Sequence, residues 1–223
     1  VQGHKQVIQH TKAYNNLQLL HGNTAYGIID TDWMDESSIQ VYKEQGIFVL
    51  PFNEVEMILV DEAVVKSCLH FDDDKEKQQK IKNLQQSIIE SCKAKKDKII
   101  SIALKKRLDE FMESHLIEKS EPNEHDAHVF LDGLSSKFDV DSTFNKINSI
   151  VVESLASSDF SRILKICNLK NEIIDYRGNT QITSKFKEKA LSRITLDSDL
   201  QTVLRHKYFE ELEMKLLDKS LNF

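Results

Sequence analysis

The sequence predicts an α/β fold with a small, mainly parallel sheet and a large helical appendage. Two short apolar runs, 24–29 and 47–50, are separated by a segment with helical spacing over 35–45. Short apolar runs are typical of buried strands, and two strands joined by a helix form a parallel βαβ unit. Because only two prolines and six glycines interrupt the 223 residues, long helices are expected over the remainder of the chain.

The N-terminal part is expected to alternate between helices and strands. The predicted elements are a helix over 4–20, a strand over 24–29, a helix within 35–45, a strand over 47–50, and one or two helices over 56–69. Gly46 is expected to end the second of these helices, since glycine readily adopts the left-handed conformation that stops a helix.

The later part of the chain is predicted to be helical. Helical spacing continues from 74 to 117, which is long for a globular helix, so we expect a break at the basic run 93–98. Beyond it we predict a polar linker at 120–127, a short strand at 129–131, a loop at 173–183, and helices over 142–157, 160–167, 184–193 and 197–221. These elements divide the chain into an α/β core (1–71), a long helical region (72–119) and a C-terminal helical part packed on the core (120–223).

Acidic residues follow both predicted strands. Asp30 and Asp32 come directly after the first strand, and Glu54 and Glu56 follow the second. The carboxyl ends of neighbouring parallel strands meet at one edge of a sheet, and carboxylate oxygens are the ligands that Mg²⁺ prefers. The sequence therefore predicts a divalent-metal site there. The alternative is that these acids are solvated loop residues or helix caps.

Residues 26–65, YGIIDTDWMDESSIQVYKEQGIFVLPFNEVEMILVDEAVV, resemble the TOPRIM-like domain of the overcoming-lysogenization-defect (OLD) nuclease group and its anti-phage relatives, which work with ABC-type ATPases. In that group a strand ends in D-x-D, a helix follows, and a second strand leads to an E-I-E-N-like segment. Here the segment is Glu54-Val55-Glu56-Met57, with methionine in place of the usual asparagine. The segments 1–16 and 160–174 resemble helices of the same family, so the resemblance is close over the first 70 residues and extends in outline beyond them.

The resemblance implies a metal-dependent nuclease that hydrolyses phosphodiester bonds. It implies that Asp30, Asp32, Glu54 and Glu56 are catalytic metal ligands, with Mg²⁺ or Mn²⁺ as the cofactor. It also implies a nucleic-acid substrate, with DNA favoured, and an ABC-type ATPase domain in the same or a partner chain. Lys170 lies where relatives carry a lysine, so it could contact the scissile phosphate; an ordinary surface lysine is the alternative.

One family feature is missing from this sequence. TOPRIM domains place a glutamate at the end of an earlier strand, whereas residues 1–29 contain no Asp and no Glu. We therefore expect that the first strand lies upstream of Val1 and that this chain shows little or no nuclease turnover alone. The alternative function is a non-catalytic TOPRIM-like sensing or docking module for an ATPase partner.

Charge and composition narrow the class of protein. A net charge of −6 argues against a protein that coats nucleic acid, although a nuclease with an acidic metal site remains compatible with it. The basic runs 93–98 and 105–107 are either solvated helix faces or a phosphate-contacting edge. With no apolar run approaching the roughly 20 residues that span a bilayer, we expect a cytoplasmic protein without a membrane partner. The sequence leaves open whether the chain forms a homo-oligomer.

Other site chemistries find little support in the sequence. The cysteines, Cys68, Cys92 and Cys167, lack metal-ligand spacing and suit a reducing compartment. The eight histidines also lack ligand spacing on any one helix; His125 and His128 come nearest, but they fall in the predicted linker. Neither a glycine-rich phosphate loop nor a nucleophile elbow is present.

Overall fold

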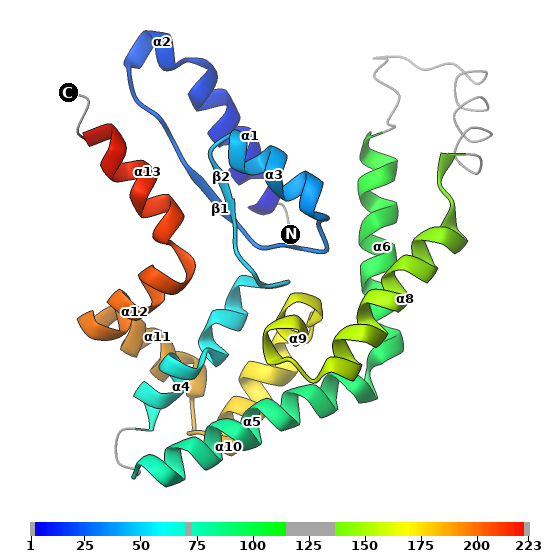
Figure 1. Cartoon of the computed structure of the whole chain (residues 1–223), viewed down its shortest axis with the longest axis vertical. Helices are drawn as coiled ribbons and strands as arrows, with labels where there is room; N and C mark the ends of the chain where they lie inside the picture. Colours follow the sequence, from blue (N-terminus) through cyan, green and yellow to red (C-terminus); the bar gives the residue numbers. More distant parts are fainter. Residues whose placement is uncertain (1–2, 70–72, 115–136, 221–223) are drawn as a thin grey trace.

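The computed structural model describes residues 3–69, 73–114 and 137–220, and these are mostly helical around one two-stranded parallel sheet (Figure 1). The N-terminal elements are α1 (Gly3–Asn16), α2 (Gln18–His21), β1 (Gly27–Ile29), α3 (Glu36–Glu44) and β2 (Ile47–Val49). The predicted linker at 120–127, the strand at 129–131 and the histidines His115, His125 and His128 lie outside the described residues.

The strand–helix–strand prediction is confirmed. β1 and β2 run parallel, with Gly27 opposite Ile47 and Ile29 opposite Val49. The pairing continues past the strands, because the Leu50 amide donates to the Ile29 carbonyl at 2.8 Å. The connection passes through α3, and Gly46 follows it with a φ of 77°, which is the left-handed conformation expected of a glycine after a helix.

Helices flank the small sheet. In Figure 1, α1 and α3 lie beside the strands, and α13 (Glu210–Ser220) approaches from the other side. Lys43 of α3 forms a 2.9 Å ion pair with Glu211 of α13, and the Lys215 ammonium lies 5.4 Å from the centre of the Phe48 ring on β2. The last helix of the chain therefore covers part of the N-terminal sheet.

The N-terminal helix is shorter than predicted. α1 ends at Asn16, and after Leu17 the separate short helix α2 begins. Leu19 and Leu20, which fall within the helix predicted over 4–20, are fully or largely exposed. Gly22 then stops α2 with a φ of 72°.

The segment after β2 is a 3₁₀ helix, η1 (Val55–Val60), followed by α4 (Glu62–Cys68). Asp61 separates the two and caps α4 by accepting a hydrogen bond from the Ala63 amide. Val60, Val64 and Val65 face inward and are buried, whereas Cys68 is only partly buried.

The predicted break in the long helix is confirmed at Lys95, between α5 (Asp74–Ala94) and α6 (Lys96–Ser114). The C-terminal elements are α8 (Val140–Ser157), α9 (Phe160–Ile166), η2 (Asn171–Gly178), α10 (Asn179–Gln181), α11 (Phe186–Leu196) and α12 (Ser198–Tyr208). The helix predicted over 197–221 is divided at Phe209 into α12 and α13.

The loop predicted at 173–183 is wrong, because most of this segment is helical. η2 is a π-helix that continues into α10. The Arg177-Gly178-Asn179 composition suggested a turn, but Gly178 serves close packing instead. A Cβ atom there would overlap the ring of Phe186, so glycine is required for contact between η2 and α11.

One apolar cluster joins the N-terminal and C-terminal parts. It extends from Trp33 to Leu204 and includes residues of α4, α5, α8, α9, α11 and α12. Trp33 is 8 % exposed within this cluster, and the thiols of Cys92 and Cys167 are buried and free. Among the described residues, no helix has the length and apolar character needed to cross a membrane.

Candidate metal site

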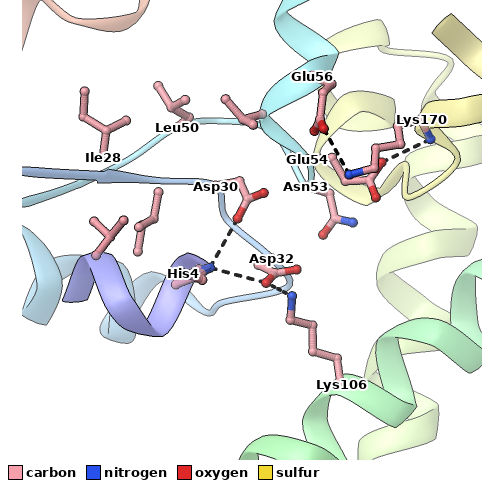
Figure 2. Close-up of a pocket in the computed structure, with 13 residues that line it drawn as sticks. His4, Ile28, Asp30, Asp32, Leu50, Asn53, Glu54, Glu56, Lys106 and Lys170 are labelled. Carbon is pink, nitrogen blue, oxygen red and sulfur yellow. Dashed lines mark hydrogen bonds and ion pairs between the residues drawn. The ribbon is translucent and has the colours of Figure 1, made fainter. Parts of the chain in front are cut away.

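A pocket of about 450 Å³ lies where the two strands end (Figure 2). Its lining includes all five residues singled out from the sequence: Asp30, Asp32, Glu54, Glu56 and Lys170. It also includes Lys106, from the basic run 105–107, and two polar residues that the sequence did not single out: His4 and Asn53. The structure therefore brings the predicted acids together and surrounds them with two lysines, a histidine and an amide.

The loop after β1 fixes the two aspartates. Thr31 donates from its amide and from its hydroxyl to the Phe52 carbonyl, at 2.8 and 2.7 Å, which ties this loop to the chain after β2. Asp32 and Trp33 then have φ values of 46° and 66°. Two successive residues other than glycine in the left-handed region cost on the order of 1–3 kcal/mol each, and such strain is often found at functional sites. The buried Trp33 side chain holds this turn in place.

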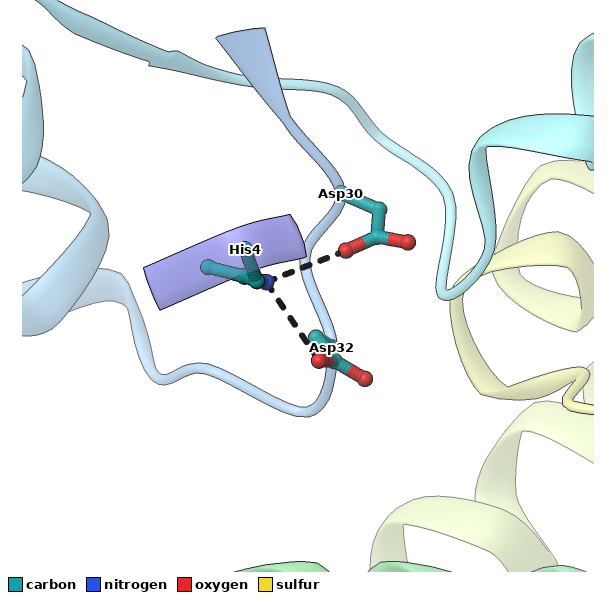
Figure 3. Close-up of side chains that lie close together, drawn as sticks. All are labelled: His4, Asp30 and Asp32. Carbon is teal, nitrogen blue, oxygen red and sulfur yellow. Dashed lines mark ion pairs between the residues drawn. The ribbon is translucent and has the colours of Figure 1, made fainter. Parts of the chain in front are cut away.

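His4 lies between the aspartates (Figure 3). Its Nδ1 atom is 3.3 Å from Asp30 Oδ1 and 3.4 Å from Asp32 Oδ2. One donor atom from each residue falls within 4.8 Å of the other two, so the three could hold one metal ion. Because His4 is in the first turn of α1 and the aspartates follow β1, the group depends on how α1 packs on the sheet.

Lys106 approaches the same aspartates from α6 and forms an ion pair with Asp32. Burial lowers the pKa of the Lys106 ammonium, whereas the Asp30 carboxylate acts in the opposite direction. The Lys106 ammonium supplies positive charge that offsets the two aspartates.

Glu54 and Glu56 form a second acidic group with Lys170. The Lys170 amide donates to Glu54 Oε2 at 3.1 Å, and its ammonium donates to Glu56 Oε1 at 3.1 Å. Burial raises the pKa of Glu54, and the Lys170 charge partly opposes this effect. The hydrogen bond to Glu56 raises the pKa of Lys170. The environment of Glu54 thus favours its protonated form.

Asn53 occupies the wall of the pocket between these groups (Figure 2). The residue is only 2 % exposed, and its amide N–H donates to the Leu164 carbonyl at 3.1 Å. Its side-chain Oδ1 is buried and has no hydrogen-bond partner among the described residues. A buried polar atom without a partner costs about 1–3 kcal/mol, so this oxygen is available to accept a hydrogen bond or to bind a cation in the pocket.

A second hollow of about 840 Å³ adjoins the pocket, because both are lined by His4, Asp32 and Lys106. Its wall adds three cationic side chains from α1 and α6: Lys5, Lys105 and Arg107. The basic run 105–107 therefore lies beside the acidic pocket. The other basic run lies at the α5–α6 junction, where Lys95 pairs with Glu172.

Sequence reasoning did not place His4, Asn53 or Lys106 among the metal ligands, and the partners of His4 and Lys106 lie on other elements. His4 has no second histidine at helical spacing, because its neighbours are aspartates that follow a strand. Lys106 belongs to a basic run whose solvated and site-facing residues look alike in sequence. Asn53 did carry a signal, since it immediately precedes Glu54 in the loop after β2.

Comparisons of the chain with models of protein families, with curated proteins and with solved structures found no match.

Proposed function

We propose that this protein is a divalent-metal-dependent nuclease that acts with an ABC-type ATPase domain, in the same chain or in a partner. The observation that carries the proposal is the group formed by His4, Asp30 and Asp32, whose donor atoms lie within 4.8 Å of one another. The group stands where a carboxylate-lined pocket meets a hollow whose wall carries lysine and arginine side chains together with Asp109 and Glu110. The resemblance of residues 26–65 to TOPRIM-like domains agrees with this assignment.

The residues fit a divalent ion. Carboxylates, an imidazole and an unpartnered amide oxygen are all metal ligands, and the Oδ1 of Asn53 lacks any other partner among the described residues. A bound Mg²⁺ or Mn²⁺ supplies Lewis-acid polarisation of a phosphoryl group. Asp30 and Asp32 would hold such an ion, with Glu54 or Glu56 beside it.

The other side chains suit a phosphodiester substrate. Lys106 and Lys170 bring positive charge to opposite sides of the pocket, where each can offset the charge of a phosphate. Glu54, with its raised pKa, can take a proton from the attacking water or give one to the leaving oxygen. Lys5, Lys105 and Arg107 in the neighbouring hollow can contact the phosphates of an adjoining strand. DNA is the substrate that we favour.

A second function has its own support. Lys106 already pairs with Asp32, Lys170 pairs with Glu56, and residues 1–29 supply no further carboxylate. A pocket whose carboxylates are paired with lysines of the same chain is stable in the fold even if it catalyses no reaction. The alternative is therefore a non-catalytic sensing or docking module for an ATPase partner.

Cleavage of DNA under single-turnover conditions tests the proposal. We expect slow, Mn²⁺-dependent nicking of a supercoiled plasmid by excess protein, with little or no multiple turnover. Asp30→Asn should abolish this nicking, whereas Asp175→Asn, an exposed aspartate on η2, should not change it. Nicking that survives EDTA, or that is equal in the Asp30→Asn variant, would contradict the nuclease. Metal binding without any nicking would favour the docking module.

A further inference from the structure

We infer that the site selects a first-row transition ion such as Mn²⁺ ahead of Mg²⁺, with His4 Nδ1 as a direct ligand and the Asn53 amide as an additional oxygen donor. This inference rests on the proposed function, because it specifies the cofactor of the same site. The resemblance that suggested Mg²⁺ or Mn²⁺ concerned carboxylates only.

The spacing of the donor atoms supports a shared ion. Nitrogen and oxygen ligands lie about 2.0–2.2 Å from such ions, which places neighbouring ligands roughly 3 Å apart. His4 Nδ1 lies 3.3 Å from one carboxylate oxygen and 3.4 Å from another. The three side chains thus approach the spacing of neighbouring ligands on one ion.

Asn53 supplies an independent indication of a ligand. The His4 group alone could be an ion pair, but an ion pair leaves the Asn53 Oδ1 without a partner. Asn53 is only 2 % exposed, and its side-chain amide lies in the pocket between Asp30 and Glu54 (Figure 2). A cation, or water held by one, would satisfy this oxygen.

The kinds of ligand atom in the site distinguish Mg²⁺ from Mn²⁺. Mg²⁺ takes oxygen ligands in near-ideal octahedral geometry and keeps several waters, whereas imidazole is a common ligand of first-row transition ions, of which Mn²⁺ binds nitrogen most weakly. A nitrogen aimed between two carboxylates therefore disfavours Mg²⁺ relative to Mn²⁺. Lys106 competes with either metal ion for the Asp32 carboxylate. It therefore lowers the affinity for both ions and does not change the preference between them.

Calorimetric titration and pulsed electron paramagnetic resonance with Mn²⁺ test the inference without measuring activity. We expect Mn²⁺ to bind at least tenfold more tightly than Mg²⁺, and bound Mn²⁺ to show electron spin-echo modulation from an imidazole nitrogen. His4→Gln should remove the modulation and most of the preference for Mn²⁺. His10→Gln, an exposed histidine on the same helix, should leave both unchanged. Asn53→Leu, which keeps the side-chain size, should weaken Mn²⁺ binding about tenfold.

The outcomes separate this inference from the proposed function. If Mn²⁺ binds in an Asp30-dependent way without nitrogen modulation, or if His4→Gln binds like the wild type, the inference is overturned and the metal-dependent function stands. If neither ion binds the wild-type protein, both the inference and the proposed metal-dependent function are contradicted. Melting of each variant without metal, measured beforehand, confirms that a change in binding does not reflect unfolding.

Discussion

Gly27 of β1 lies so close to Thr11 of α1 that a Cβ atom at position 27 would be 2.8 Å from the Thr11 hydroxyl oxygen. The same atom would be 2.9 Å from a methyl group of Val7, on the same helix. Thr11 is buried at this contact, so α1 can rest on the strand only because residue 27 has no side chain. His4, two turns earlier on α1, reaches Asp30 and Asp32 as a consequence.

Gly27→Ala should therefore weaken both the fold and the metal site. Overpacking of this kind costs about 1–3 kcal/mol, which urea denaturation would measure. The shift of α1 should also reduce Mn²⁺ affinity, although the substituted residue is no ligand. Gly27→Ala in a Thr11→Ala background should recover part of both losses. If Gly27→Ala binds Mn²⁺ with wild-type affinity, His4 does not depend on the close approach of α1.

The pairing of Asp61 with Tyr208 is expected to hold α4 to α12. Asp61 is 3 % exposed, and its Oδ2 accepts from the Tyr208 hydroxyl at 2.5 Å and from the Lys207 ammonium at 2.6 Å. Since its Oδ1 also caps α4, Asp61→Ala should lower the free energy of unfolding by about 2–4 kcal/mol. Half-exposed Lys207 should contribute little, so Lys207→Met is the matched control. Equal losses in the two variants would show that the ion pair, not the cap and the tyrosine, stabilises this contact.

Acid should remove the contribution of the cap on α3. The Ser38 amide donates to Asp35, and this hydrogen bond, with those of the Ser37 and Ser38 side chains, lowers the pKa of Asp35 to about 2. Because the folded-state pKa is depressed, the stabilisation is complete above the unfolded-state pKa of about 4 and is lost as pH falls through about 2. At pH 7, Asp35→Ala should cost about 1 kcal/mol.

Urea titrations of wild type, Asp35→Ala and Asp35→Asn from pH 6 down to pH 3 would measure this loss. The gap between wild type and Asp35→Ala should narrow as the pH falls. Asp35→Asn, which keeps an oxygen acceptor that does not titrate, should show no such narrowing relative to Asp35→Ala. A gap that stays constant over this range would mean that the charge of Asp35 does not contribute to the cap.

Local patterns predicted the fold where each element is specified by its own residues. The apolar runs before Asp30 and before Pro51, and the break at Lys95, could be read along the chain. The segment around Gly178 could not, because its glycine is required by a phenylalanine that comes later in the sequence. A π-helix has no periodicity that marks it, and turn-like composition favoured a loop.

The candidate site could likewise be predicted only in part from the sequence. Asp30, Asp32, Glu54 and Glu56 follow strands, and the parallel pairing of those strands brings their carboxylates together. His4 and Lys106 join them only through the packing of α1 and α6, which sequence spacing does not reveal. Lys106 forms an ion pair with Asp32 and so offsets part of the repulsion between the aspartates. Asp30→Asn should therefore change the melting temperature of the metal-free protein little.

Thermal melting with and without Mn²⁺ tests the central claim, that the pocket is a divalent-metal site, most directly. An ion at 100 times its dissociation constant stabilises a protein by about 2.7 kcal/mol, which corresponds to a rise of roughly 5–10 °C for a chain of this length. We predict such a rise for the wild type and for Glu153→Gln, an exposed carboxylate on α8, and none for Asp30→Asn. An equal rise in the wild type and in Asp30→Asn would contradict the claim and leave the D-x-D turn with a structural role.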